Sequence, residues 1–242
     1  MRLSENTTRA RVLLLPFIPI LLAVSAGTDC PPPAEPGPNQ PPHPTELALP
    51  EPRPDSSVSL EQTLLQRRSV RSYSDEPLTL DEVSQLLWAA QGITDPRGYR
   101  TAPSAGATYP LETYLVAGNV ADVGPGVYRY DPEEHALVKV IDGDVRAGLA
   151  SAALAQSSVR EGAISIVFTA VYARTTQRYG DRGVRYVHME AGHAAQNVYL
   201  QAVALNLGTV VIGAFHDDQV SSILDLPADE QPLYIMPLGR TG

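Results

Sequence analysis

The sequence predicts an α+β fold with a central, mostly antiparallel sheet flanked by helices. Residues 111–118, 126–131 and 136–141 read as strands joined by Gly/Pro and Asp-Pro turns, which is typical of antiparallel hairpins. Residues 184–208 instead read as a long helix whose surface is largely apolar or small. Such a helix belongs in a core or in a subunit interface, so we expect it to lie at the centre of the molecule or of a dimer.

The remaining elements follow in order along the chain. The second helix begins with a capping box, because Thr79 is followed three residues later by Glu82, and Gly92 should end it. Residues 163–172 form a continuous apolar run rich in β-branched residues, which indicates a central strand buried on both faces. We expect further helices over 59–68, 79–93, 142–156 and 217–226, strands over 209–215 and 232–239, and an end to the long helix at Gly208.

The N-terminal part of the chain differs from the rest. Residues 1–30 place arginines before the apolar run 12–24 and small residues after it, which is the layout of a secretory signal and predicts export. A lipid anchor on Cys30 and a wrongly assigned start on a cytoplasmic protein are the alternatives. The run is too short to span a bilayer comfortably, so a membrane is expected only through this leader.

A proline-rich stretch over 31–57 predicts an extended, disordered linker, and the folded domain should occupy 58–242.

Composition excludes several classes of function. The formal net charge of -9 and a pI near 5.0 argue against a general nucleic-acid binder. The single cysteine excludes a disulfide framework and a cysteine-based zinc site within one chain. His188 and His193 do not share a helical face, so no metal site is expected. GxSxG, GxGxxG and Walker patterns do not occur in the sequence.

Three stretches could carry chemistry. In RRSVR (67–71), the first two arginines could sit at a helix end and favour its dipole, or the arginines and Ser69 could converge on one phosphate. The small residues of 103–106 would let a ligand approach the backbone, but they also suit an ordinary turn. Gly213 could expose main-chain N–H groups to a ligand or only end a strand.

Six segments together resemble the FMN-dependent nitroreductase superfamily and, within it, the SagB/ThcOx-type dehydrogenases. They appear in the family's order as RRSVRSY (67–73), PSAGATYP (103–110), GVYRYD (126–131), the run 178–208, VVIGAF (210–215) and MPLGR (236–240). The resemblance implies an FMN cofactor and an obligate homodimer with the long helix at its core and the flavins at the interface. It also implies which residues contact the cofactor. Arg67, Ser69, Arg71 and Arg240 match positions at the phosphate or ribityl chain, and Arg68 matches a backbone or ring-edge contact. Pro103, Ser104, Ala105 and Gly106 match a loop beside the partner subunit's flavin, Gly213 and Ala214 match donors near flavin N5 and O4, and Gln196 with Asn197 fits the GHxxQN pattern.

The same resemblance suggests catalytic residues. Family members that oxidise azolines carry a Lys-Tyr pair where this chain has Arg178 and Tyr179. Arginine stays charged and cannot act as a base, which weighs against azoline oxidation here. We expect an oxidoreductase that passes hydride between a small-molecule or peptide-heterocycle substrate and flavin N5. The alternatives are an NAD(P)H-dependent nitro- or quinone reductase, an exported flavin-binding module without turnover, and a protein that has lost flavin.

Overall fold

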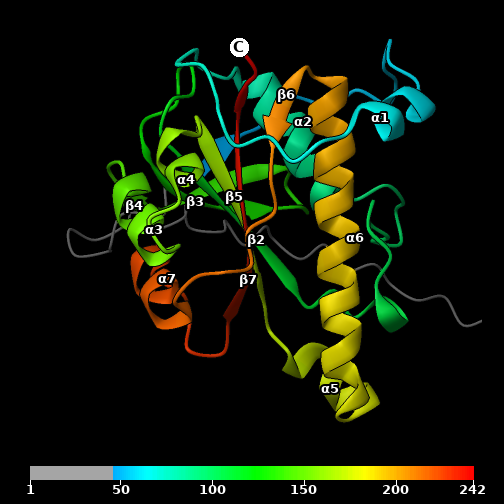
Figure 1. The fold of residues 1–242 in the computed structure, drawn as a ribbon. Helices are drawn as coiled ribbons and strands as arrows, with labels where there is room; N and C mark the ends of the chain where they lie inside the picture. The colour runs from blue at the N-terminus through cyan, green and yellow to red at the C-terminus, as the bar shows by residue number, and fades with distance from the viewer. Residues whose placement is uncertain (1–45) are drawn as a thin grey trace, which may run out of the picture. The chain divides into compact units, whose positions relative to one another are not determined.

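An antiparallel sheet of seven strands forms the centre of the structure, a computed structural model that describes residues 46–242 (Figure 1). The strand order is β1-β4-β3-β2-β5-β7-β6, and every ladder between named strands is antiparallel. The predicted α+β class is therefore confirmed. The strands are β1 (Glu46–Ala48), β2 (Leu111–Ala117), β3 (Gly126–Asp131), β4 (Ala136–Asp142), β5 (Ile164–Ala170), β6 (Leu207–Thr209) and β7 (Gln231–Arg240).

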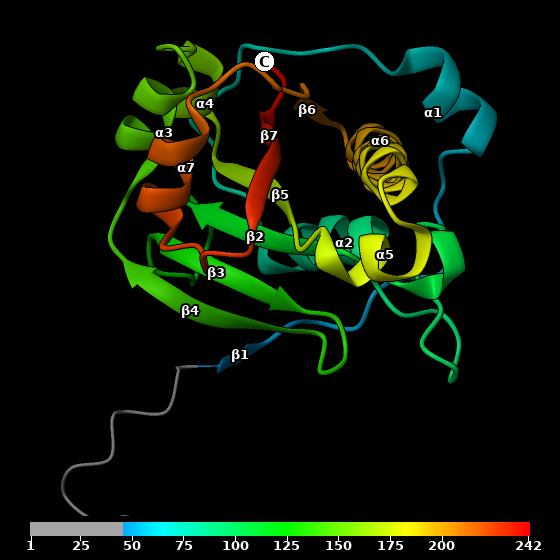
Figure 2. The ribbon, with the colours of Figure 1, turned by 90° about the horizontal axis from the view of Figure 1, so that it is seen from below.

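Helices cover both faces of this sheet, which separates two apolar clusters (Figures 1 and 2). One face carries α2 (Leu80–Gln91) and α6 (Arg182–Ala204), and the other carries α3 (Arg146–Ala152), α4 (Ser157–Glu161) and α7 (Asp217–Leu224). The strand β5 is buried at every position, as its continuous apolar run predicts. The other helices are α1 (Leu60–Gln66), α5 (Ala173–Tyr179) and the 3-10 turn η1 (Ala105–Ala107).

Local signals placed the ends of α2 correctly. The Thr79 side chain accepts a hydrogen bond from the backbone of Glu82, and the Glu82 side chain accepts one from the backbone of Thr79. Gly92 is the residue at which the helix ends. Such a capping box satisfies two backbone donors that the helix itself leaves unpaired, and the sequence shows it directly.

The predicted end of the long helix was wrong. α6 ends at Ala204, and Asn206 takes a left-handed conformation with φ 56°. Gly208 instead lies inside β6, so the strand expected over 209–215 shrinks to β6 and an isolated bridge between Ile212 and Ile235. Asparagine tolerates the left-handed region, which lets the chain turn before the glycine is reached.

Two other boundaries also differ from the expectation. The helix expected over 142–156 is shortened to α3, because Leu154 and Ala155 both adopt positive φ, and α4 begins only at Ser157. The folded unit begins before Val58: β1 pairs with β4, and the backbone N–H of Arg53 donates to Gln85 at 2.8 Å. The expected linker 31–57 is therefore too long at its C-terminal end. The leader 1–30 and residues 31–45 lie outside the described residues.

Residues 46–242 contain no helix long and apolar enough to cross a membrane. The same residues hold no group of His, Cys, Asp and Glu side chains suited to a metal ion.

Candidate functional site

The segment that follows α1 carries the arginine cluster across the edge of the sheet. The backbone N–H of Val70 donates to the Thr209 carbonyl at 2.9 Å, and that of Ser74 donates to the Arg240 carbonyl at 2.9 Å. These two bonds attach residues 67–74 to the ends of β6 and β7. The cluster is thus held on the protein at two points, and Arg67 and Arg68 do not continue the helix.

Two glycines make this close approach possible. A Cβ on Gly208 would lie 2.7 Å from the Val70 side chain, and a Cβ on Gly239 would lie 2.7 Å from the Tyr73 side chain. Both distances are shorter than side chains accept, so only glycine fits at either position. The family-like endings NLG and PLG therefore seat the arginine segment.

Tyr199 on α6 is the centre of this region. Its hydroxyl lies 3.1 Å from Ser69 Oγ and accepts a hydrogen bond from the backbone N–H of Val211 at 2.9 Å. The Arg67 guanidinium stands over its ring, 5.1 Å from the ring centroid. One phenol thus joins the arginine segment to the strand-like segment that leads to Gly213, a link that spacing alone did not reveal.

The arginines of this cluster are open to solvent and to ligands. Arg68 and Arg71 are exposed and Arg67 is half-buried. Within the described part of the chain, none of the three forms an ion pair with a carboxylate. Arg68 instead donates to the carbonyls of Leu65 at 3.0 Å and Arg67 at 2.8 Å. Three guanidinium groups without acidic partners suit a strongly anionic ligand such as a phosphate.

Arg240, at the end of β7, forms ion pairs with two carboxylates. Its guanidinium pairs with Glu82 at 3.0 Å and with Glu76 at 3.5 Å. Glu82 is also the residue that closes the capping box of α2. Arg240 therefore links the end of β7 to the start of α2, and its charge is already matched by carboxylates.

The other residues expected near the ring lie on exposed surface. Gly213, Ala214 and Gln196 are exposed, and no main-chain carbonyl among residues 46–242 accepts the N–H of Gly213 or Ala214. The Ala214 carbonyl accepts a bond from Gln156 Nε2 at 3.3 Å. Neither N–H group is therefore used by the main chain of the described residues. We call these residues, with Arg67, Arg68, Ser69 and Arg71, the arginine group.

The loop of small residues forms a second part of the site. Pro103 is exposed, Ser104 and Ala105 are half-buried, and Gly106 adopts φ 63° in η1. Ser104 Oγ accepts a hydrogen bond from the backbone N–H of Tyr109 at 2.9 Å and so closes the loop on itself. A hollow of 480 Å³ opens beside it, lined by Tyr99, Arg100, Ala102, Pro103, Ser104, Gly106, Ala107, Tyr109 and Arg178.

The predicted catalytic pair, Arg178 and Tyr179, lies at the end of α5 and contacts this loop. Arg178 Nη1 donates to the Gly106 carbonyl at 3.0 Å. A Cβ on Gly106 would lie 2.5 Å from the Tyr179 hydroxyl and 2.7 Å from Arg178 Nη1, so the ends of both side chains would have to move to admit one. The Tyr179 ring packs edge-on against Tyr186, with centroids 5.2 Å apart. The structure thus brings together Arg178, Tyr179 and residues 103–106, which we call the loop group.

One functional candidate was missed. Glu190 on α6 is 2% exposed, and burial raises its pKa from 4.5 to about 7, against the opposing effects of the Ser104 hydroxyl and the Arg100 charge. The sequence did contain a signal for it. Glu190 stands next to the apolar face made by Val187, Ala191 and Ala194, and an acidic residue there should be buried.

The arginine group and the loop group do not meet on one side of α6. Tyr199 contacts the first and Glu190 the second, and these residues lie about two and a half turns apart, or about 13 Å along the helix. They therefore point to opposite sides of α6, whose axis Figure 2 views nearly end-on. Within one subunit, a single ligand therefore does not contact both the arginine group and the loop group.

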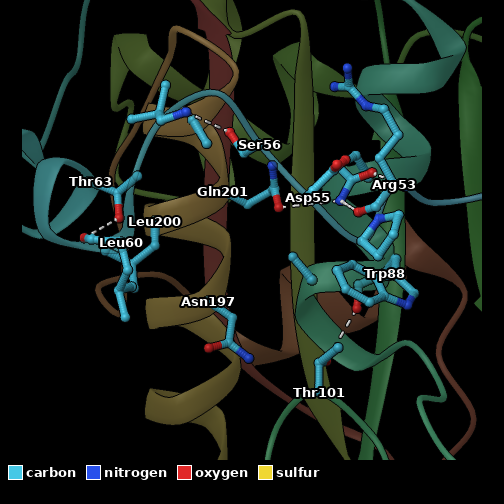
Figure 3. Close-up of a pocket in the computed structure, with 15 residues that line it drawn as sticks. Arg53, Asp55, Ser56, Leu60, Thr63, Trp88, Thr101, Asn197, Leu200 and Gln201 are labelled. Atoms are coloured by element: carbon cyan, nitrogen blue, oxygen red, sulfur yellow. Dashed lines mark hydrogen bonds between the residues drawn. The ribbon is translucent and has the colours of Figure 1, made fainter.

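Another cavity, of 390 Å³, lies between residues 53–58, α1, α2 and α6 (Figure 3). Trp88, Gln85, Gln201 and Asn197 line it, and Asn197 is the only residue of the GHxxQN pattern there. None of the residues predicted to hold a cofactor lines this cavity. The residues that the sequence predicts to hold the cofactor lie elsewhere, in the two groups described above.

Comparisons with known proteins identify the family. The model of the Nitroreductase family matches residues 64–240. A Methanocaldococcus jannaschii protein that bears a nitroreductase name is 51% identical over 195 residues, covering 81% of this chain and 96% of the relative. The Escherichia coli microcin B17-processing protein McbC is 28% identical over 155 residues, covering 62% of this chain and only 57% of the relative. The FMN reductase (NADPH) of Bacillus subtilis is 25% identical over 193 residues, covering 74% of this chain and 64% of the relative.

Solved structures show the same fold. A Ralstonia eutropha protein with a nitroreductase name superposes with a TM-score of 0.70 at 30% identity, covering 86% of this chain and 98% of the other. The E. coli microcin synthetase McbBCD complex with truncated pro-MccB17 matches with a TM-score of 0.63 at 25% identity, covering 78% and 77%. Because the family model spans most of the chain and the archaeal relative aligns over nearly its whole length, this chain belongs to the nitroreductase family of oxidoreductases.

Proposed function

We propose that this chain is an FMN-dependent oxidoreductase of SagB/nitroreductase type, which passes hydride between a small-molecule or peptide-heterocycle substrate and flavin N5. The observation that carries the proposal is the arginine group. Arg67, Arg68 and Arg71 follow one another on a segment fixed to the sheet, without acidic partners among the described residues. A basic cluster of this kind on a chain of net charge -9 calls for an anionic ligand.

The residues present fit FMN. Its phosphate requires cations and hydroxyl donors, which Arg67, Arg71 and Ser69 supply next to one another. Its flat ring requires small residues and free main-chain donors, which Gly213 and Ala214 supply. When bound, the flavin supplies the two-electron redox chemistry, and the protein binds, orients and shields the reactants. The flavin reductase relative of B. subtilis supports this choice of cofactor.

We also propose a homodimer in which the loop group of one subunit completes the arginine group of the other. The two groups lie on opposite sides of α6, so a second copy is the simplest way to bring them to one ligand. Apolar surface is available for such an interface. Leu60, Leu64 and Leu65 on α1 are 59%, 54% and 66% exposed, and Met189 on α6 is 52% exposed. Large apolar side chains that stay this open in one chain mark a surface for association.

Tyr179 is the proposed proton-handling group. Its hydroxyl is held over Gly106, where it faces the loop that would border the flavin. Arg178 stands 5.4 Å from the Tyr179 ring centroid and bonds to the Gly106 carbonyl, so it orients the phenol and the loop together. Because arginine stays charged, any proton that leaves or reaches the substrate here is carried by Tyr179.

An NAD(P)H-dependent nitro- or quinone reductase is the second candidate. It is favoured by Arg178 in place of the family's lysine and by the nitroreductase name of the archaeal relative. The SagB-type alternative is favoured by the similarity to the microcin-processing protein McbC and to the McbBCD complex, which was solved with truncated pro-MccB17 bound. Both candidates share the cofactor and differ in the electron donor.

An absorption spectrum of the purified protein tests the proposal. We expect a yellow protein that retains FMN through gel filtration, elutes as a dimer and bleaches on anaerobic addition of a hydride donor. Rapid bleaching by NADPH followed by reoxidation with a nitroaromatic selects the reductase, whereas bleaching only by an azoline-containing substrate selects the SagB-type dehydrogenase. A colourless protein that does not take up added FMN contradicts the proposal.

We further propose that the leader 1–30 directs export of the folded domain. Fractionation of cells that express the full chain, with N-terminal sequencing of the product, tests this. A new N-terminus near Gly27 outside the cytoplasm supports export, and an intact Met1 in the cytoplasm contradicts it.

A further inference from the structure

The hollow beside the loop group contains two guanidinium groups that no carboxylate neutralises. Arg100 and Arg178 both line this space of 480 Å³. Among residues 46–242, neither forms an ion pair with an acidic side chain. Arg100 is half-buried, and a charge that leaves water without a partner is costly. The hollow therefore calls for an anionic ligand.

The other charges near this hollow already have partners. Arg97 pairs with Asp95 at 2.8 Å, and Arg174 pairs with Glu112 at 2.6 Å. Each of these pairs is neutral as a whole. The positive charge that remains beside the loop group is therefore that of the two arginines that line the hollow.

Both guanidinium groups keep donors for a ligand. A guanidinium carries five N–H groups in a planar fork. Arg100 Nη1 donates to Gln91 Oε1 at 3.0 Å, and Arg178 Nη1 donates to the Gly106 carbonyl at 3.0 Å. Within the described part of the chain, neither guanidinium makes another hydrogen bond. The remaining N–H groups suit a carboxylate, whose two oxygens match the fork.

One short turn brings the two arginines together. Arg178 is bonded to Gly106 at one end of the turn 106–109, and Arg100 stands over the Tyr109 ring at the other end, 4.6 Å from its centroid. The backbone N–H of Arg100 also donates to the Tyr109 hydroxyl at 3.3 Å. Because the turn has only four residues, both guanidinium groups lie within reach of one small ligand.

The backbone of this turn is strained. Besides Gly106, Ala107 and Tyr109 adopt positive φ, of 52° and 43°. This region is uncommon for residues with a side chain and least favourable for a bulky one, and such strain is typical of ligand sites. The turn is held in place at Tyr109, whose backbone N–H donates to Ser104 Oγ at 2.9 Å and whose carbonyl accepts from Arg174 Nη1 at 3.1 Å.

The rest of the lining suits a flat ligand. Tyr99, on the loop before the turn, is 44% exposed and lines the hollow together with Tyr109. Alanine, proline, serine and glycine complete most of the remaining wall. Aromatic rings stack on other planar groups, and small side chains leave room for them. The lining therefore favours an acid attached to an aromatic ring over a flexible aliphatic acid.

We propose that this hollow is the binding site for a planar aromatic carboxylate, whose acid group is held by Arg100 and Arg178. This inference rests on the proposed function, because it takes the acid to be the substrate and the flavin to border the hollow. The arginine group holds the phosphate of the cofactor in that scheme, so the two cationic sites serve different anions. Arg178 binds the substrate as well as the loop.

The test compares two probes of nearly the same shape, para-nitrobenzoate and the neutral para-nitrobenzamide. Their dissociation constants are measured by isothermal titration calorimetry on the full-length protein saturated with FMN. We expect the acid to bind at least about tenfold more tightly than the amide, because its bonds to guanidinium groups are charge-assisted. Added salt should reduce this preference. The acid should also shift the visible absorption band of the bound flavin.

Variants of two neighbouring arginines locate the site. Arg100→Gln should reduce the preference for the acid to about twofold or less, because it removes a charge that has no other partner. Arg97→Gln is the matched control. Arg97 belongs to the same loop, but it is already paired with Asp95 and does not line the hollow. This variant should therefore keep the preference of the wild type.

The outcomes separate this inference from the proposed function. A wild type that takes up no FMN overturns the proposed function and, with it, the acid as a substrate beside the flavin. A wild type that binds FMN but binds acid and amide equally overturns the acid site alone. A preference that persists in Arg100→Gln, or an acid that leaves the flavin band unchanged, also overturns it. If Arg100→Gln does not fold, a lost preference in Arg178→Gln supports the site and a retained one contradicts it.

Discussion

Replacing Glu190 by glutamine should change how the stability of the fold depends on pH. The folded-state pKa of this carboxyl is about 7, against 4.5 in the unfolded chain, because burial disfavours its charge. Each pKa unit corresponds to 1.36 kcal/mol, so the charged side chain costs the folded state about 3 kcal/mol. Glutamine fills the same space and carries no charge, so the variant does not meet this cost.

The sign follows from proton binding. Below about pH 4.5 the carboxyl is neutral in both the folded and the unfolded state and carries no cost. Between that pH and about 7 the folded state holds a proton that the unfolded state has lost, so the free energy of unfolding of the wild type falls as pH rises. Above about pH 7 the cost is complete. The difference in the free energy of unfolding between Glu190→Gln and the wild type should therefore increase by about 3 kcal/mol, in favour of the variant, as pH rises across this range.

Urea unfolding followed by circular dichroism, at fixed protein and FMN concentrations, measures this difference at each pH. A constant offset between the two proteins reflects the packing of the amide and does not bear on the argument; only the change with pH does. Glu161→Gln, at an exposed position on α4, serves as the control and should run parallel to the wild type. A difference between Glu190→Gln and wild type that stays constant from about pH 4.5 to 8 would refute the claim that Glu190 is buried as the structure shows.

Three further predictions concern the groups around the proposed flavin. Arg67→Ala should weaken FMN binding about tenfold and make it less dependent on salt. Arg240→Ala should chiefly lower the free energy of unfolding, by about 1–2 kcal/mol, because it leaves the half-buried Glu82 without its cation. If both variants lose FMN equally in a binding titration, this difference between the two arginines is contradicted. Tyr179→Phe should retain the flavin but slow substrate turnover at least tenfold in steady-state assays, and unchanged turnover clears Tyr179 of the proton-handling role. Gly106→Ala should disturb the loop, because the backbone is at φ 63° and the new Cβ meets the Tyr179 hydroxyl. The free energy of unfolding should fall by about 1 kcal/mol or more, which lowers the midpoint of thermal unfolding. An unchanged midpoint contradicts the loop geometry.

Much of the fold could be predicted from local chemistry. The capping box of α2, the hairpin turns between β2, β3 and β4, and the buried run of β5 each depend on residues close together in the sequence. α5 and β1 were missed because neither carries an amphipathic pattern of its own: α5 is a short helix next to a long one, and β1 exists only because β4 offers it an edge.

The candidate site divides in the same way. The arginine segment, the loop of small residues and the Arg178–Tyr179 pair could be recognised as motifs, and the structure brings the last two together. The ion pairs of Arg240 could not be predicted from its motif, because Glu76 and Glu82 are far from it in sequence and reach it only when β7 ends beside α2.

By itself, the sequence determined the fold class, the family and the residue types at the site, because these are set by periodicity, turns and short motifs. Only the tertiary structure decided which charges meet and which side of α6 each group occupies. Burial, ion pairing and the direction of a side chain depend on neighbours from distant parts of the chain. For that reason the raised pKa of Glu190, whose place beside an apolar helix face can be read in the sequence, follows only once α6 is packed in the fold.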